Sequence, residues 1–393
     1  MAAPPLRRAV IAFAFLMVAE FFYAWAWNTV DVLRPFIRDT LHLSLTEAGA
    51  GYSAQGAGAL IGALTLGQLA DRVGRRRILA LIMVGYGSLL LIGVAVSTYP
   101  QFLAQRFVLG FFMGGIFPVV VGIYVGLFAS NVRGRLASLI NAVASFAIVM
   151  LGLASGALAG RDWHDLLLLG GIPPILLAGL AFVLIPPSVD TRVAGGLARL
   201  PVAELFAPGL RRQTLLLASL TGLNFFAYQS YSGWLTIYLT DIRHLAVATI
   251  GPLVAWQFAG NIVGGFFWGW VGDRFGRRAC ALGFFLASLA IAAYLVVPTV
   301  LAALTVIGAA YGFMLSASVI WGPWITELYP PHLKSTAASI FNWGRIVSFF
   351  APLITGQVAT HFGLTAAMAG ASLVFLVAGL IWISLPETFV KRG

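Results

Sequence analysis

Charged residues are scarce in this sequence, and their scarcity excludes a fold that is stable in water. Only 9% of the 393 residues are Asp, Glu, Lys or Arg, whereas 60% are hydrophobic and the mean hydropathy is +0.94. A soluble domain is about 25% charged and about 45–50% apolar. Because too few polar side chains exist to cover a surface in water, we predict an integral membrane protein surrounded by lipid.

Cysteine and histidine are also rare. Cys280 is the single cysteine, which excludes an internal disulfide and a cysteine-based metal site. The five histidines fall at the ends of apolar runs or between them, without metal-ligand spacing, at positions 42, 164, 244, 332 and 361. No convergent catalytic set is present. We therefore expect no metal, no cofactor and no enzymatic activity, and the lack of an attached signalling domain argues against a receptor.

Acidic residues are about half as common as basic ones, 13 against 24, which gives a net charge of +11. The basic residues lie in short clusters between apolar runs, as topology signals of membrane proteins do, so no nucleic-acid partner is expected. Arg38, Arg161 and Arg243 lie on one side of the membrane, three arginines lie within spans, and the other 18 Lys and Arg lie opposite. We expect the richer side, with both termini and the central loop, to be cytoplasmic in the bacterial inner membrane.

Apolar runs of about 20 residues predict membrane helices. Twelve such runs cover residues 9–35, 47–70, 78–97, 100–128, 136–160, 166–186, 213–239, 247–271, 279–297, 299–326, 336–360 and 364–385. The first run follows Arg7 and Arg8 and also resembles a cleavable signal peptide. Glu20 would fit badly at the end of an apolar signal core, so we expect a membrane helix there.

The two halves of the chain repeat each other. Gly67–Arg76 has the pattern G-x-x-x-D-R-x-G-R-R, and Gly269–Arg278 repeats it 202 residues later. A parallel duplication of this kind is expected to place a substrate site near mid-membrane between the halves. We predict an all-α membrane protein of twelve helices in two pseudo-symmetric six-helix bundles, residues 1–186 and 213–393, with a cytoplasmic linker at 187–212.

The duplicated pattern resembles the signature loop of the major facilitator superfamily. Gln105–Gly115 is similar to its helix 4 motif, and Glu327–Pro330, Gly344–Arg345 and Pro386–Thr388 resemble proton-coupled aromatic-acid symporters and related organic-ion and sugar porters. The D-G-x-D pattern of the aromatic-acid group's first helix is absent. The helix 5 proline motif of drug/proton antiporters is also missing, because Ser145–Gly160 contains no proline.

The resemblance implies that the two signature loops act as a gate. In similar proteins, ion pairs at the cytoplasmic ends of helices 2 and 8 latch the two halves in the outward-facing state. The corresponding gating candidates are Asp71, Arg72, Arg75, Asp273, Arg274, Arg277 and Glu327. The alternative is that the loops serve only as topology signals with tight turns.

Ionisable groups inside the expected spans are functional candidates, because a charge at the bilayer centre costs about 2.5–3.5 kcal/mol. Glu20 lies near the middle of the first span, and Asp31 shares its helix face with Trp27 and Asn28. Desolvation favours the protonated form of a buried carboxyl, which suits a group that loads and releases a proton. The proton-coupling candidates are therefore Glu20, Asp31 and Arg106. Fixed salt bridges, or helix packing for Arg106, are the alternatives.

Arg345, about ten residues into the eleventh span, is the candidate anchor for a substrate anion, because its planar guanidinium matches a carboxylate. Other candidate substrate contacts are polar or aromatic residues expected to face inward, since polar groups facing lipid are costly. They are Trp27, Asn28, Tyr228, Gln229, Gln257, Asn261 and Asn342. Hydrogen bonds between helices are the alternative role for the polar ones.

These features together predict proton-coupled symport of a small organic anion, such as an aromatic or sugar acid, by rocker-switch alternating access. A proton-driven effluxer of drugs or metabolites is one alternative, which the missing helix 5 motif disfavours. A sugar porter is the other, suggested by Pro386–Thr388. We expect a monomer whose partners are the substrate, protons and membrane lipid.

Overall fold

The computed structural model describes residues 5–128, 130–158, 162–190, 202–330, 333, 337 and 340–388, and their regular elements are helices. The chain divides into two compact units, Met1–Gly196 and Leu197–Gly393. The division falls within residues 187–212, where we expected a linker; positions 191–201 of that segment lie outside the described residues.

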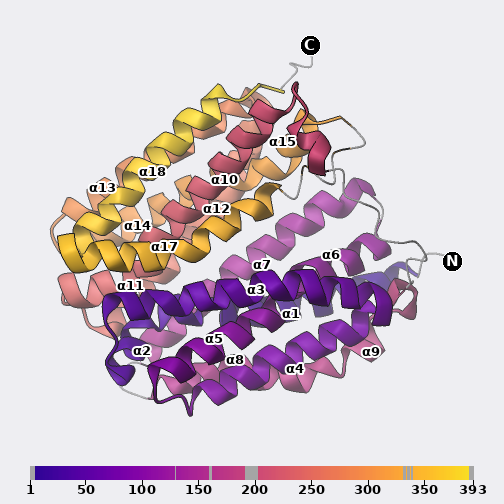
Figure 1. Ribbon diagram of the computed structural model, residues 1–393, viewed down its shortest axis with the longest axis horizontal. Coiled ribbons are helices and arrows are strands. Elements are labelled where there is room, and N and C mark those ends of the chain that lie inside the picture. Colours follow the sequence, from indigo (N-terminus) through magenta and orange to yellow (C-terminus); the bar gives the residue numbers. More distant parts are fainter. Residues whose placement is uncertain are drawn as a thin grey trace. The chain divides into compact units, whose positions relative to one another are not determined.

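The N-terminal unit is built from long helices (Figure 1, indigo to magenta). Its elements are α1 (Leu6–Val32), α2 (Arg34–Leu41), α3 (Leu45–Val73), α4 (Arg75–Gly93), α5 (Tyr99–Gly114), α6 (Ile116–Leu127), α7 (Ser130–Ala157), α8 (His164–Ala178) and α9 (Ala181–Leu184). Within the unit, α3 packs along α5, α4 along α8, and α1 along α7.

The C-terminal unit repeats this organisation (Figure 1, rose to yellow). Its main helices are α10 (Arg211–Tyr231), α11 (Leu235–Ile237), α12 (Val247–Phe275), α13 (Ala281–Val296), α14 (Leu301–Leu315), α15 (Trp321–Leu328), α17 (Ile340–Phe362) and α18 (Leu364–Ser384). A one-turn helix, Ser232–Trp234, and a π-helical turn, Tyr238–Ile242, continue α10 and α11. α12 packs along α14, and α10 packs against α17 and α18.

Each of the twelve expected spans is helical over most of the residues that the structure describes. Eight helical stretches in the described residues are both long and apolar enough to cross a membrane. The other four expected spans correspond to α3, α8 with α9, α10 with α11, and α17, which are shorter or more polar.

Several spans are interrupted where we expected continuous helices. The first breaks at Leu33, between α1 and α2, and Pro35 lies in the first turn of α2, where its missing N–H is tolerated. The fourth breaks at Gly115, between α5 and α6. The start of α3 is fixed by a capping box, in which Ser44 and Glu47 bond to each other's backbone N–H.

The duplication read from the sequence is repeated in the backbone. Two non-glycine residues among those described have positive φ angles, His42 at 51° and His244 at 52°, and they are 202 residues apart. Gly74 and Gly276 are separated by the same offset and have φ angles of 112° and 103°. The φ angles of Gly74 and Gly276 are unfavourable for residues with a Cβ atom. The turns that end α3 and α12 therefore require glycine at these two positions.

Glycines also allow two helices of each unit to approach closely. A Cβ added at Gly58 of α3 would lie 1.9 Å from the carbonyl oxygen of Phe107 in α5. The equivalent atom at Gly260 of α12 would lie 2.0 Å from the carbonyl oxygen of Ala309 in α14. Small residues at such crossings let helix backbones meet within a membrane, where no hydrophobic effect drives helices together.

Adjacent glycines of α12 provide a matched test of this packing. We expect Gly264→Ala to destabilise the protein by about 1–3 kcal/mol, because its Cβ would lie 2.3 Å from the Phe313 carbonyl oxygen. Gly265→Ala should leave the melting temperature unchanged or slightly raised, since nothing lies within 4 Å of the added atom and alanine favours helix. Thermal unfolding of the purified protein measures both. Equal melting temperatures for the two variants would contradict the close packing.

Candidate functional site

The polar face of α1 is buried. Glu20 lies at the centre of this helix and is 9% exposed. Asn28 is also buried, and its amide donates a 2.7 Å hydrogen bond to the Ala24 carbonyl in the same helix. Trp27 is half-buried and packs edge-on against Tyr52 of α3. The face predicted from i, i+4 spacing is therefore enclosed by protein.

Asp31 lies in a buried cluster with two arginines. Its carboxylate forms an ion pair with Arg34, which is 1% exposed. Arg106 of α5, 2% exposed, donates a 3.0 Å hydrogen bond to Thr29 Oγ1 and a 3.5 Å hydrogen bond to Gln55 Oε1. Asp31 is therefore paired with Arg34, and Arg106 joins α1, α3 and α5 by hydrogen bonds to neutral groups.

Sequence reasoning missed Gln55 and Thr29 in this cluster. Gln55 is fully buried, and its Nε2 donates to the Trp27 carbonyl while its Oε1 accepts from Arg106. Gln55 and Gln257 are 202 residues apart, so the internal repeat was the signal that could have identified it.

The polar candidates of α10 and α12 are held between helices. Gln257 is 2% exposed, and its Nε2 donates a 2.9 Å hydrogen bond to Ser232 Oγ. Asn261 donates a 3.3 Å bond to the Gly312 carbonyl of α14. Gln229 is fully buried, whereas Tyr228 is half-buried. These contacts favour the helix-joining alternative for Gln257 and Asn261.

Arg345 differs from the other candidates because its side chain is exposed. Its guanidinium carbon lies 5.5 Å from the centre of the Phe225 ring of α10. It forms no ion pair with the acidic residues that the structure describes. The side chain of Asn342, one turn earlier, lies outside the described residues.

An ion-pair cluster lies at the ends of α12 and α15 in the C-terminal unit. Arg277 donates to Asp273 Oδ1 at 2.8 Å and holds both carboxylate oxygens of Glu327, at 2.9 and 3.3 Å. Burial acts to lower the pKa of Arg277, but hydrogen bonds to Glu327 and Asp273 outweigh it and raise the pKa above its usual value. The guanidinium is therefore charged at any physiological pH.

Glu387 joins this cluster from the segment after α18, although we had not placed it among the gating residues. Its carboxylate accepts hydrogen bonds from the backbone N–H groups of Arg277 and Arg278, at 3.0 and 2.8 Å. Thr388 Oγ1 donates to Glu327 Oε2 at 2.5 Å. The motif Pro386–Thr388 thus ties the end of the chain to the signature loop.

The equivalent loop of the N-terminal unit makes different contacts. Arg75 donates a 2.9 Å hydrogen bond to the Gly122 carbonyl at α6. Arg72 is exposed, as is its counterpart Arg274, which lies over the Phe275 ring. The Asp71 side chain is outside the described residues. The two loops share a backbone turn at Gly74 and Gly276.

A profile of the Major Facilitator Superfamily matches residues 16–255 and residues 217–392, which together cover nearly the whole chain. The chain belongs to this superfamily. It is therefore a secondary transporter in the membrane and not an enzyme, and the resemblance noted in the sequence is confirmed.

Curated relatives of similar length are organic-acid transporters by name. The gallate transporter of Pseudomonas putida is 26% identical over 415 residues, covering 95% of this chain and 90% of the relative. The cis,cis-muconate transport protein of Acinetobacter baylyi is 24% identical over 376 residues, which cover 91% of this chain and 88% of the relative. The niacin transporter NiaP of the same organism is 25% identical over 412 residues, which cover 94% of this chain and 91% of the relative.

Solved structures share the fold at lower identity. A bacterial homologue of the human lysosomal transporter Spinster matches with a TM-score of 0.80 and 17% identity, covering 98% of this chain and 97% of that one. The nucleoside transporter NupG matches with a TM-score of 0.73 and 14% identity, covering 95% and 98%. These matches confirm the predicted fold class, an all-α membrane protein with twelve helices in two bundles.

Proposed function

We propose that this transporter couples proton entry to the uptake of a small organic acid across the bacterial inner membrane. The observation that carries the proposal is Arg345, an exposed guanidinium on a membrane helix without an acidic partner among the described residues. A charge that stays ionised at that position needs a water-filled surface or an anionic ligand. A carboxylate satisfies it with two parallel hydrogen bonds.

An aromatic or unsaturated acid fits this anchor best. The Phe225 ring lies against the guanidinium of Arg345 and offers an apolar surface beside the charge. Relatives named for gallate, cis,cis-muconate and niacin carry flat acids of this kind. Sugar acids share the carboxylate and remain within the proposed class.

Glu20 is the proposed proton carrier. It is buried at the centre of α1. Asp31, the other candidate, is held in an ion pair with the buried Arg34. Because Asp31 is held in this ion pair, we assign the proton-carrier role to Glu20. Rocker-switch movement of the two units would then expose Glu20 to each side in turn.

A ligand screen tests the substrate class directly. Purified protein is heated with gallate, cis,cis-muconate, benzoates, sugar acids, neutral sugars or cationic drugs, and ligands that bind only the folded state raise the melting temperature. Organic acids should raise it, and the acids that do so should accumulate in proteoliposomes under an inward proton gradient. A shift with neutral sugars alone would favour the sugar-porter alternative suggested by Pro386–Thr388. A shift with cationic drugs alone would favour an effluxer.

The Arg277–Glu327 pair is proposed to act as a latch during transport. We expect Glu327→Gln to slow uptake about two- to fivefold without changing substrate affinity, since a partly exposed ion pair contributes up to about 1 kcal/mol. Arg277→Gln should slow uptake at least as much, and the double variant should show less than the sum of the two losses. Initial uptake rates and binding by thermal shift measure both properties. Additive losses would contradict a shared ion pair.

The cytoplasmic location of the termini is tested by cysteine labelling. In a Cys280→Ser background, a cysteine replacing Ser188 should react with a membrane-impermeant maleimide only from the cytoplasmic side. A cysteine replacing His164 should react only from the opposite side, because the two residues flank the sixth span. Labelling of both positions from one side would exclude the proposed topology.

A further inference from the structure

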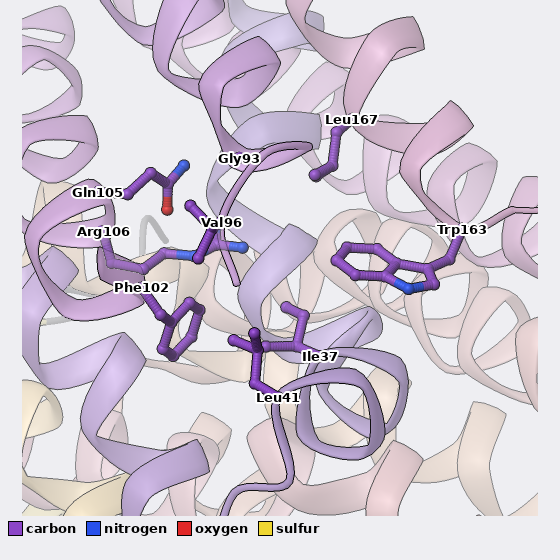
Figure 2. A pocket seen from close by; sticks show the side chains of 9 residues that line it. All are labelled: Ile37, Leu41, Gly93, Val96, Phe102, Gln105, Arg106, Trp163 and Leu167. Atoms are coloured by element: carbon purple, nitrogen blue, oxygen red, sulfur yellow. The ribbon is translucent and has the colours of Figure 1, made fainter. Parts of the chain in front are cut away.

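A small pocket lies inside the N-terminal unit. Figure 2 shows its walls, which come from α2, the segment after α4, α5 and the start of α8. The guanidinium of Arg106 extends toward Val96, and the Trp163 ring faces it from the other side. Leu41 and Leu167 complete a mostly apolar lining. None of the proposed substrate-binding residues lines this pocket.

Arg106 is incompletely satisfied by protein. Within the described residues only its Nη1 donates hydrogen bonds, to Thr29 and Gln55, and both acceptors are neutral. Its Nε is fully enclosed without a partner. A guanidinium that is 2% exposed loses the hydration that would otherwise stabilise its charge. An additional acceptor beside Arg106 would compensate for that loss.

The local charge balance favours a negative acceptor. Asp31 forms its ion pair with Arg34, so the buried cluster of Asp31, Arg34 and Arg106 carries one excess positive charge. Bound water would hydrogen-bond to Arg106 but would leave this charge uncompensated. A monovalent anion satisfies both requirements.

The lining restricts which anion fits. Trp163 Nε1 donates to Thr40 Oγ1, and one N–H of the Gln105 amide donates to the Leu89 carbonyl, which leaves Arg106 as the only charged group among the residues that line the pocket. The cavity volume open to the centre of a water-sized sphere is about 10 Å³, which suits one small ligand. We propose that the pocket binds a single halide-sized anion, such as chloride, on Arg106. This site is separate from the organic-acid anchor at Arg345.

Thermal shift with inorganic salts tests the site without any organic substrate. At constant sodium concentration and ionic strength, replacing gluconate by chloride or bromide should raise the melting temperature of the wild-type protein by about 2 °C near saturation. Arg106→Gln removes the charge, and Val96→Phe fills the pocket while keeping Arg106. Both variants should lose the halide-dependent shift. Val94→Phe, the same change at an exposed position two residues earlier, should keep it.

Two results would overturn the proposal. The first is the absence of a halide-dependent shift in the wild-type protein. The second is an equal shift in the wild type, Val96→Phe and Val94→Phe, which would mean that halide acts on the surface. A variant that fails to fold is replaced by Val96→Leu, which fills less of the pocket and should reduce the shift in proportion. Organic-acid uptake is measured separately, so a failure of the proposed symport leaves this result interpretable.

Discussion

Proton-driven accumulation of the organic acid is expected to disappear in the Glu20→Gln variant, while exchange of acid down its own gradient continues. Glutamine keeps the size and hydrogen-bonding capacity of Glu20 but cannot bind and release a proton at physiological pH. An inward gradient of one pH unit provides about 1.4 kcal/mol per proton, or about tenfold accumulation. Proteoliposomes with and without this gradient measure the ratio of internal to external acid. The variant should equilibrate the acid without concentrating it.

The Asp31→Asn variant tests whether Asp31, and not Glu20, is the proton carrier on α1. Asp31 is paired with Arg34, so its removal leaves two buried arginines without a carboxylate and should lower stability by about 3–5 kcal/mol. Accumulation per folded protein should nevertheless depend on the proton gradient as in the wild type. If accumulation survives in Glu20→Gln and is lost in Asp31→Asn, the proton-carrier role belongs to Asp31.

The helices were predictable because the membrane imposes a simple rule on composition. An uninterrupted apolar run must form a helix to satisfy its backbone, and the run at 247–271 became α12 at Val247–Phe275. Helix interruptions at Leu33 and Gly115 were not predictable in this way, since they change the backbone without changing the hydropathy. The internal repeat predicted more, including the matching turns at Gly74 and Gly276.

The sequence indicated which residues could form the candidate site, but it did not indicate which residues they contact. Helical spacing placed Glu20 and Asp31 on one face, yet the pairing of Asp31 with Arg34 depends on the break between α1 and α2. Gln55 was missed because a lone glutamine gives little signal without its repeat partner. Glu387 was noticed as part of a family motif, but its contacts require the chain after α18 to reach the signature loop.

Affinity for organic acids should fall most strongly when Arg345 is replaced. Arg345→Ala removes a charge-assisted, bidentate contact that contributes about 1.5–3 kcal/mol, so the Kd should rise about ten- to 150-fold. Arg345→Lys keeps the charge but loses the planar fork, and its affinity should lie between those of the wild type and the alanine variant. Stability should change little, because the Arg345 side chain is exposed and makes no ion pair with described residues.

Matched variants distinguish an anchor from a general charge effect. Arg211→Ala removes the same charge from an exposed position at the start of α10 and should bind organic acids as the wild type does. Phe225→Leu removes the ring beside Arg345 and should weaken aromatic acids more than aliphatic ones. Ligand-dependent melting and uptake at several acid concentrations give both affinities. If Arg345→Ala binds organic acids as tightly as the wild type does, the carboxylate is held elsewhere. If neutral or cationic ligands bind and organic acids do not, the substrate is not an anion.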